Sequence, residues 1–319
     1  MSAARRGSSV VVVGAGVIGL TAAWRLSEAG YAVRLWSRDD ALATTSSVAA
    51  AIWYPFLAEP RDRVLGWSRR TFERLAELAR EPGSGVRMQR VVEVFATAAP
   101  DLWWRTAVPH LERLPAHEVP PPYAAAIRLE VPVCDVPIHL PWLIGELARR
   151  GVVVERRTVS SFDEAFAVAD TVVNCTGLGA AELCGDRELQ PVRGQVLLCA
   201  GADVPTAWVD DTSERPIYLI PRRDGVVVGG TAQVGDPRLA ADPADSQAIL
   251  AAATRRFPQL RQADVRAVRV GLRPYRSSVR LEVVALADGR RLVHDYGHGG
   301  SGWTLAWGCA DEVVALLGG

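Results

Sequence analysis

Lysine is absent from the 319-residue sequence, so all 36 of its strongly basic side chains are arginines. They are balanced by 36 acidic side chains, which leaves a formal net charge of zero. Binding to nucleic acid or to an anionic membrane surface depends on excess positive charge, so we expect neither partner. No apolar stretch approaches the roughly 18 residues that a membrane-spanning helix needs. We therefore expect a cytoplasmic protein.

Cysteine, asparagine and methionine are scarce. The five cysteines are odd in number and form no C-x-x-C pair, so we do not expect a metal site. We expect buried thiols in a reducing compartment instead. They are Cys134, Cys175, Cys184, Cys199 and Cys309. The single asparagine and the two methionines are typical of a thermophilic protein.

The composition that remains is that of a globular enzyme. Apolar residues make up 49% of the chain and charged residues 23%, which is ordinary for a soluble protein. A chain of 319 residues can bury a sizeable core and divide into two lobes.

The first informative motif is a dinucleotide-binding fingerprint. The apolar run 10–13 predicts a strand buried on both faces, and a helix is expected over residues 20–29. Between them, Gly14 allows the tight turn, Gly16 lets backbone approach a pyrophosphate, and Gly19 lets helix and strand pack closely. The helix N-terminus would offer unpaired N–H groups to the anion. The alternative is a tight strand–helix turn without a ligand.

Three later segments extend this pattern. After the expected strand 32–36 comes Ser37-Arg38-Asp39, so the carboxylate that often binds the ribose is displaced or replaced. Residues 44–53 place hydroxyls before very small side chains, which suits a phosphate and a flat ring, although a capped helix is the alternative. Residues 297–302 form a second glycine-rich turn before a final helix.

The remaining elements follow from hydrophobic periodicity and from proline and glycine. Helices are expected over 63–80, 141–150, 246–257 and 303–317. Strands are expected over 86–97, 152–155, 171–175, 190–198, 217–220, 226–228, 265–270 and 279–286, with a loop over 115–122. We expect an α/β fold in which a Rossmann-like nucleotide-binding domain (1–56, 130–200 and 287–319) is interleaved with a mainly antiparallel-sheet substrate domain (57–129 and 201–286).

Taken together, these segments resemble the D-amino-acid oxidase family of FAD-dependent enzymes. The resemblance covers nearly the whole chain, and its most specific motifs are Gly271-Leu272-Arg273-Pro274 and the Tyr-Gly-His-Gly-Gly run that starts at Tyr296. It implies non-covalently bound FAD and hydride transfer from the substrate Cα–H to flavin N5. It also implies reoxidation by dioxygen to hydrogen peroxide, and hydrolysis of the imino acid to a 2-oxo acid and ammonia.

The resemblance also implies roles for individual residues. Arg273 matches the clamp for the substrate α-carboxylate, since a planar guanidinium can donate two parallel hydrogen bonds. Tyr218 matches a tyrosine that adds a further bond, and Gly300 matches a carbonyl that receives the amino group. Tyr54 is expected at the substrate. The expected cofactor-binding residues are Gly14, Ala15, Gly16, Val17, Ile18, Gly19, Arg38, Asp39, Thr44, Thr45, Ser46, Ala50, Ala51, Ile52, Val159, Thr176, Gly177, Gly299, Gly300, Ser301, Gly302, Trp303 and Thr304.

Substrate choice is less determined by the sequence. The pocket for the substrate side chain is predicted to be mainly apolar, because its candidate residues are Trp53, Tyr54, Phe56 and Ile217. We therefore expect neutral D-amino acids as substrates. Arg215 or Arg222, if either points inward, would instead suit D-aspartate.

The segment before Ile217 is shorter than a long family lid, which predicts product release without slow lid opening.

The partners implied are a small D-amino acid and dioxygen, with a homodimer as an option. Other readings are another FAD-dependent amine oxidase, a nicotinamide-dependent dehydrogenase and a non-catalytic flavoprotein.

Overall fold

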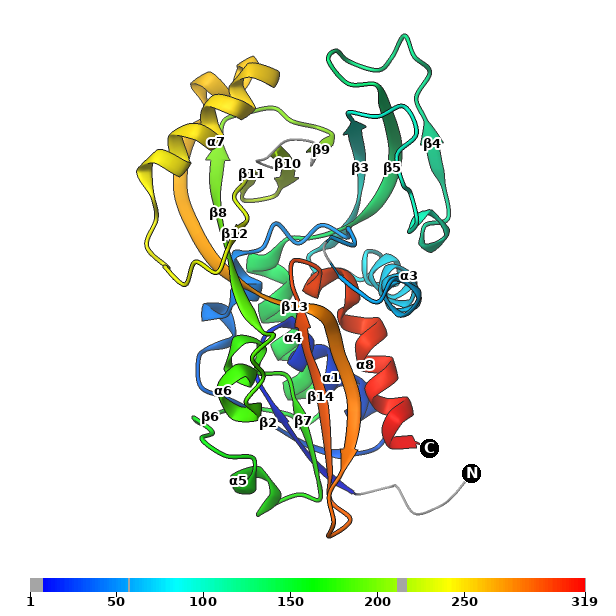
Figure 1. The fold of residues 1–319 in the computed structure, drawn as a ribbon, viewed down its shortest axis with the longest axis vertical. Helices are drawn as coiled ribbons and strands as arrows, with labels where there is room; N and C mark the ends of the chain where they lie inside the picture. The colour runs from blue at the N-terminus through cyan, green and yellow to red at the C-terminus, as the bar shows by residue number, and fades with distance from the viewer. Residues whose placement is uncertain (1–7, 57, 211–216, 319) are drawn as a thin grey trace.

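One sheet runs through the computed structural model, which describes residues 8–56, 58–210 and 217–318 (Figure 1). Within these residues its strand order is β4-β5-β3-β9-β10-β11-β8-β13-β14-β7-β1-β2-β6, and β12 pairs with β8. The strands are β1 (Ser9–Val13), β2 (Ala32–Ser37), β3 (Val86–Phe95), β4 (Leu111–Arg113), β5 (Ala125–Cys134), β6 (Val154–Arg156), β7 (Thr171–Asn174), β8 (Gln190–Ala200), β9 (Ala207–Asp210), β10 (Ile217–Arg222), β11 (Gly225–Gly229), β12 (Gln233–Val234), β13 (Asp264–Ala285) and β14 (Arg291–His298). The α-helices are α1 (Val17–Glu28), α2 (Thr45–Val48), α3 (Arg61–Leu78), α4 (Val136–Arg149), α5 (Asp163–Phe166), α6 (Ala180–Cys184), α7 (Pro243–Arg256) and α8 (Gly302–Gly318).

The lower half of Figure 1 is a parallel sheet covered on both faces. Strands β6, β2, β1, β7 and β14 are all parallel. Val10 and Val12 of β1 pack in the core formed with α1, α4 and α8, whereas Val11 and Val13 pack with Phe162 and α5 on the opposite face. Burial on both faces explains why β1 is an uninterrupted apolar run.

The upper half is mainly antiparallel and is joined to the lower half by β13. The first part of this 22-residue strand pairs with β8 and its second part pairs with β14. The sequence predicted two strands, 265–270 and 279–286, and that prediction was wrong. Pro274 lies within the strand, opposite Pro191, and a register irregularity between Tyr275 and Arg280 separates the two pairing regions.

Helix α4 and strand β5 also differ from what the sequence predicted. Helix α4 begins at Val136 rather than at residue 141, so Pro141 lies inside the helix instead of starting it. Strand β5 was not predicted, although it pairs with β3 along its whole length, and the predicted domain boundary at residue 130 falls within it. The predicted helices at 20–29 and 63–80 correspond to α1 and α3. The predicted loop 115–122 contains neither helix nor strand.

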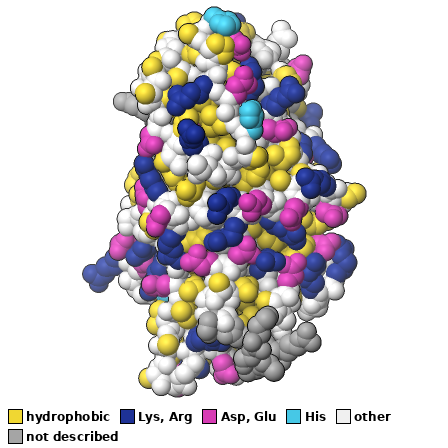
Figure 2. Space-filling view, turned by 90° about the vertical axis from the view of Figure 1, so that its right-hand side faces the viewer, with side chains coloured by type: hydrophobic (Ala, Val, Ile, Leu, Met, Phe, Trp, Pro, Cys, Tyr) yellow, Lys and Arg dark blue, Asp and Glu magenta, His cyan; other side chains and the backbone are white. Residues whose placement is uncertain are grey.

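The surface mixes both signs of charge. Figure 2 shows dark blue and magenta side chains interspersed over the face turned to the viewer, as expected for equal numbers of basic and acidic residues. In the described part of the chain, a search for helices with the length and apolar character of a bilayer span found none.

Candidate active site

The turn from β1 into α1 has the close packing that the fingerprint predicts. Gly14 adopts φ +111°, and a Cβ there would lie 2.3 Å from the carbonyl oxygen of Cys175. A Cβ on Gly19 would lie 1.8 Å from the carbonyl oxygen of Gly14. A side chain at either position would therefore overlap backbone. These two glycines bring the N-terminus of α1 directly against the ends of β1 and β7.

Two distant segments lie over this helix N-terminus. The hydroxyl oxygen of Ser46, in α2, accepts a hydrogen bond from the Val17 amide at 2.9 Å. The carbonyl of Ser46 accepts another from the Trp303 indole at 3.2 Å. Neighbouring Thr45 donates to the Leu272 carbonyl at 3.1 Å. The segments around residues 16, 46 and 303 therefore converge.

Three further predicted cofactor residues, Arg38, Val159 and Thr176, follow the parallel strands β2, β6 and β7. Arg38 follows β2, is exposed, and has a pKa raised by its hydrogen bond to Asp39. Thr176 follows β7 and donates to the Asn174 side-chain oxygen at 2.7 Å. Val159 packs against the apolar cluster on this face of the sheet. Open α/β sheets bind ligands at this edge.

The beginning of α8 fastens the segment that contains Tyr54 and Phe56. The Ser301 hydroxyl accepts from the Phe56 amide at 2.8 Å and donates to the Phe56 carbonyl at 2.6 Å. The Thr304 hydroxyl makes the same pair of bonds to Tyr54, at 3.0 and 2.8 Å. Two hydroxyls thus make the backbone hydrogen bonds that a neighbouring strand would otherwise make, and they fix this segment against the helix.

Arg273 lies where the two halves of the sheet meet. Its guanidinium lies over Gly194, where a Cβ would come within 2.3 Å of one terminal nitrogen. The same group donates to the Thr231 carbonyl at 2.9 Å. The Gly299 amide donates to the Pro274 carbonyl at 2.9 Å, so the second glycine-rich turn lies beside Arg273. A Cβ on Gly300 would lie 3.5 Å from the Arg273 Cδ.

Tyr218 reaches Arg273 from β10. The two side chains are hydrogen-bonded, and burial raises the pKa of Tyr218 above its usual value even though Arg273 acts to lower it. The phenol is therefore protonated at neutral pH. Its ring lies against Gly229, where a Cβ would come within 2.0 Å of the Tyr218 Cζ. The arrangement brings Arg273, Tyr218 and Gly300 together.

The apolar residues expected around the substrate have different environments. Phe56 faces Gly300, with its Cδ1 only 3.0 Å from where a Cβ on that glycine would lie. Trp53 is instead a core residue, because it is 1% exposed and donates from its indole to the Ser68 carbonyl at 2.8 Å. Tyr54 donates from its hydroxyl to the Glu93 carboxylate at 2.6 Å.

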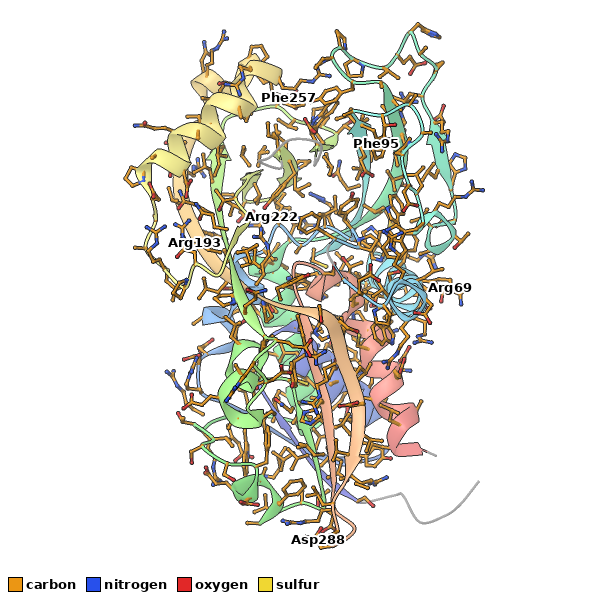
Figure 3. The ribbon with its side chains drawn as sticks, viewed as in Figure 1. Arg69, Phe95, Arg193, Arg222, Phe257 and Asp288 are labelled. Atoms are coloured by element: carbon orange, nitrogen blue, oxygen red, sulfur yellow. The ribbon has the colours of Figure 1, made fainter. Side chains whose placement is uncertain are left out.

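The side chain of Arg222 is hydrogen-bonded within the protein. Its side chain is fully buried, forms two hydrogen bonds with Asp224 at 2.8 and 2.9 Å, and donates to the Ala49 carbonyl at 3.2 Å. Figure 3 places it between the two halves of the molecule. Arg215 and the segment predicted to be a short lid lie outside the described residues.

Glu93 and Asp295 are among the buried acidic groups that sequence reasoning missed. Glu93 is 2% exposed, and its place between Val92 and Val94 in an apolar run was the available signal. Asp295 is 1% exposed and lies 3.1 Å from His298, with Cys309 close by. The pattern offered no comparable signal for this group.

The described residues fit an FAD. The two glycine-rich turns lie against the N-termini of α1 and α8, and the hydroxyls of Ser46 and Ser301 tie their neighbouring segments to these turns. Such helix ends suit a diphosphate and the negative charge of a reduced flavin ring. Ala49 and Ala50 have small side chains, as the approach of a flat ring system to the backbone requires.

Comparison with known proteins agrees with this arrangement. Residues 9–316 match the family model described as FAD dependent oxidoreductase. The chain is 45% identical to a D-amino-acid oxidase of Rubrobacter xylanophilus, over 97% of this chain and 95% of the relative. It is 42% identical to a D-amino-acid oxidase of Streptomyces coelicolor (98% and 97%) and 34% identical to a human D-aspartate oxidase (97% and 94%). A glycine oxidase structure from Geobacillus kaustophilus shares the fold at a TM-score of 0.81 and 20% identity, covering 98% of this chain and 95% of that one.

These matches, together with the glycine-rich turns at the N-termini of α1 and α8, define an FAD-dependent oxidoreductase. The chain belongs to the D-amino-acid oxidase family, as its sequence motifs predicted, and its cofactor is FAD.

Proposed function

We propose that this protein oxidises neutral D-amino acids with dioxygen to 2-oxo acids, ammonia and hydrogen peroxide. The observation that supports this proposal is the hydrogen-bonded pair of Arg273 and Tyr218 beside Gly300. A guanidinium and a protonated phenol form a donor set for one carboxylate. The sequence similarity to D-amino-acid oxidases from two bacteria supports the same substrate class.

In this proposal the chain acts by binding and orientation. Arg273 and Tyr218 donate hydrogen bonds to the α-carboxylate, and the Gly300 carbonyl accepts one from the amino group. Three fixed contacts on two groups set the direction of the Cα–H bond, which is the step that positioning can accelerate. FAD, when bound, supplies the hydride acceptor. The N-terminus of α8 stabilises negative charge near its first turn.

The cofactor is proposed to bind without a covalent bond. The residues proposed to hold it are the fingerprint (14–19), Arg38, Asp39, Thr44, Thr45, Ser46, Ala50, Ala51, Ile52, Val159, Thr176, Gly177 and the turn 299–304. Cys175 and Cys309 lie near the glycine-rich turns, but burial raises the pKa of both thiols well above its usual value. A neutral thiol is a poor nucleophile. Denaturing the protein and filtering it should therefore release the yellow chromophore into the filtrate; a chromophore retained with the polypeptide would show a covalent link.

Preference for neutral over acidic substrates is proposed from the state of Arg222. A D-aspartate side chain would need a buried cationic partner. Arg222 already pairs with Asp224 and with the Ala49 carbonyl. A D-aspartate side chain could therefore bind Arg222 only if those contacts were lost.

The proposal is tested by peroxide release from paired D- and L-amino acids with the purified, FAD-loaded protein. We expect peroxide from D-alanine and D-valine and none from their L-enantiomers. L-selective oxidation would contradict the proposed stereochemistry. A yellow protein that releases peroxide from no amino acid would contradict the reaction itself, and a protein that binds NAD but no flavin would contradict the cofactor assignment.

A further inference from the structure

Thr231 contacts the arginine of the proposed carboxylate clamp from a break in the sheet. Its backbone carbonyl accepts a hydrogen bond from the Arg273 guanidinium at 2.9 Å. Thr231 lies between β11, which ends at Gly229, and β12, which begins at Gln233. The register of β11 with β8 ends at the pair of Gly229 and Val196, so regular strand pairing does not fix the position of Thr231.

The Thr231 hydroxyl makes the contact to β8 that strand pairing would otherwise make. It accepts a hydrogen bond from the Gln195 amide at 2.8 Å. The backbone bond from the Thr231 amide to the Gln195 carbonyl is longer, at 3.3 Å. Both residues are buried, and a buried amide that loses its acceptor is unfavourable. The hydroxyl therefore ties Thr231 to β8.

The side chain of Gln195 is itself fixed by hydrogen bonds to several elements. Its oxygen accepts from the Arg193 guanidinium at 2.7 Å and from the Asp242 amide at 2.8 Å. Its nitrogen donates to the Asp242 carbonyl and to the Ser246 hydroxyl, each at 2.8 Å. Asp242 caps helix α7, and Arg193 is fully buried. A side chain held on all these sides is rigid, so Thr231 is attached to a fixed part of the fold.

We propose that Thr231 is a positioning residue for Arg273. This inference rests on the proposed function, in which Arg273 binds the substrate α-carboxylate. An arginine side chain is long and flexible, and a carbonyl that binds one of its terminal nitrogens sets the direction of the other N–H groups. The Thr231 hydroxyl fixes that carbonyl relative to β8. A displacement of about 1 Å at such a contact can lower a rate by roughly 100-fold.

The test is Thr231→Val, which keeps the branched shape of threonine but replaces the hydroxyl with a methyl group. We expect the KM for D-alanine to rise by roughly tenfold, because the carboxylate contact loses its alignment. The inhibition constant of propionate, a carboxylate without an amino group, should rise by a similar factor. Thr231→Ser keeps the hydroxyl, so both constants should stay within twofold of the wild type.

Thr71→Val is the matched control. Thr71 is also fully buried, and its hydroxyl accepts a hydrogen bond from the Gly308 amide at 2.9 Å, between α3 and α8. This variant loses the same kind of bond away from the clamp. It should lower the melting temperature but leave the KM and the propionate inhibition constant unchanged. A purely structural role for Thr231 would give the same pattern in Thr231→Val.

The outcomes separate this inference from the proposed function. If the wild type and Thr231→Val oxidise D-alanine with the same KM and the same propionate inhibition constant, Thr231 does not position Arg273, whereas the proposed function stands. If the wild type oxidises no D-amino acid, the proposed function fails and this inference fails with it. Thr231→Ala is the second variant should Thr231→Val not fold, and wild-type constants in that variant would also overturn the inference.

Discussion

Replacing Arg273 with leucine should lower kcat/KM for every D-amino acid substrate by roughly 30- to 5,000-fold while the protein keeps its flavin spectrum. Removing one partner of a buried, hydrogen-bonded charge pair costs about 2–5 kcal/mol, and each 1.36 kcal/mol is a tenfold change in rate. The leucine also leaves Tyr218 without the guanidinium to which it is hydrogen-bonded. Steady-state peroxide formation gives the rate, and the visible absorption of the flavin reports whether the cofactor is retained.

Two further variants define what that loss means. Arg273→Lys keeps the charge but not the planar fork, so an intermediate loss is expected. Arg266→Leu removes an arginine from the same strand whose side chain is 63% exposed, and it should leave kinetics unchanged. Undiminished binding and turnover in Arg273→Leu would show that this side chain does not hold the substrate.

A structural feature could be predicted from the sequence when the residues that form it are contiguous in the chain. The β1–α1 turn was predictable because its strand, its glycines and its helix are contiguous, and the packing of Gly14 and Gly19 follows from local geometry. The meeting of Arg273 with Gly300 was reached only through a resemblance to known motifs. In the fold, the contact between Arg273 and Gly300 depends on the hydrogen bond that the Gly299 amide donates to the Pro274 carbonyl.

Pairing between distant strands was the least accessible feature. Strand β13 was predicted as two strands, and in the structure each of its halves pairs with a different neighbour. Strand β5 was missed, although it forms ten register pairs with β3. The position of Glu93 and Tyr218 on the same side of the sheet depends on register across β3, β9 and β10. Hydrophobic periodicity describes one strand at a time and does not specify its neighbours.

Replacing Gly19 with alanine should abolish FAD retention during purification and lower the melting temperature of the protein. The added methyl would lie 1.8 Å from the Gly14 carbonyl oxygen and 3.3 Å from the Cys175 Cβ, in a place where the nearest neighbour is backbone. Helix α1 must then move away from β1, and the amides at its N-terminus move with it. Overpacking of this kind typically costs about 1–3 kcal/mol, to which the lost stabilisation by bound cofactor adds.

Gly66→Ala is the matched control for this variant. Gly66 lies within helix α3 with open space around it, so the same substitution should leave FAD retention unchanged and stabilise the helix by about 0.5–1 kcal/mol. Flavin absorbance per polypeptide and thermal unfolding with and without added FAD measure both effects. A Gly19→Ala protein that retains stoichiometric FAD and an unchanged melting temperature would mean that α1 can shift without opening the anion site. Close contact at Gly19 would then not be what positions the cofactor.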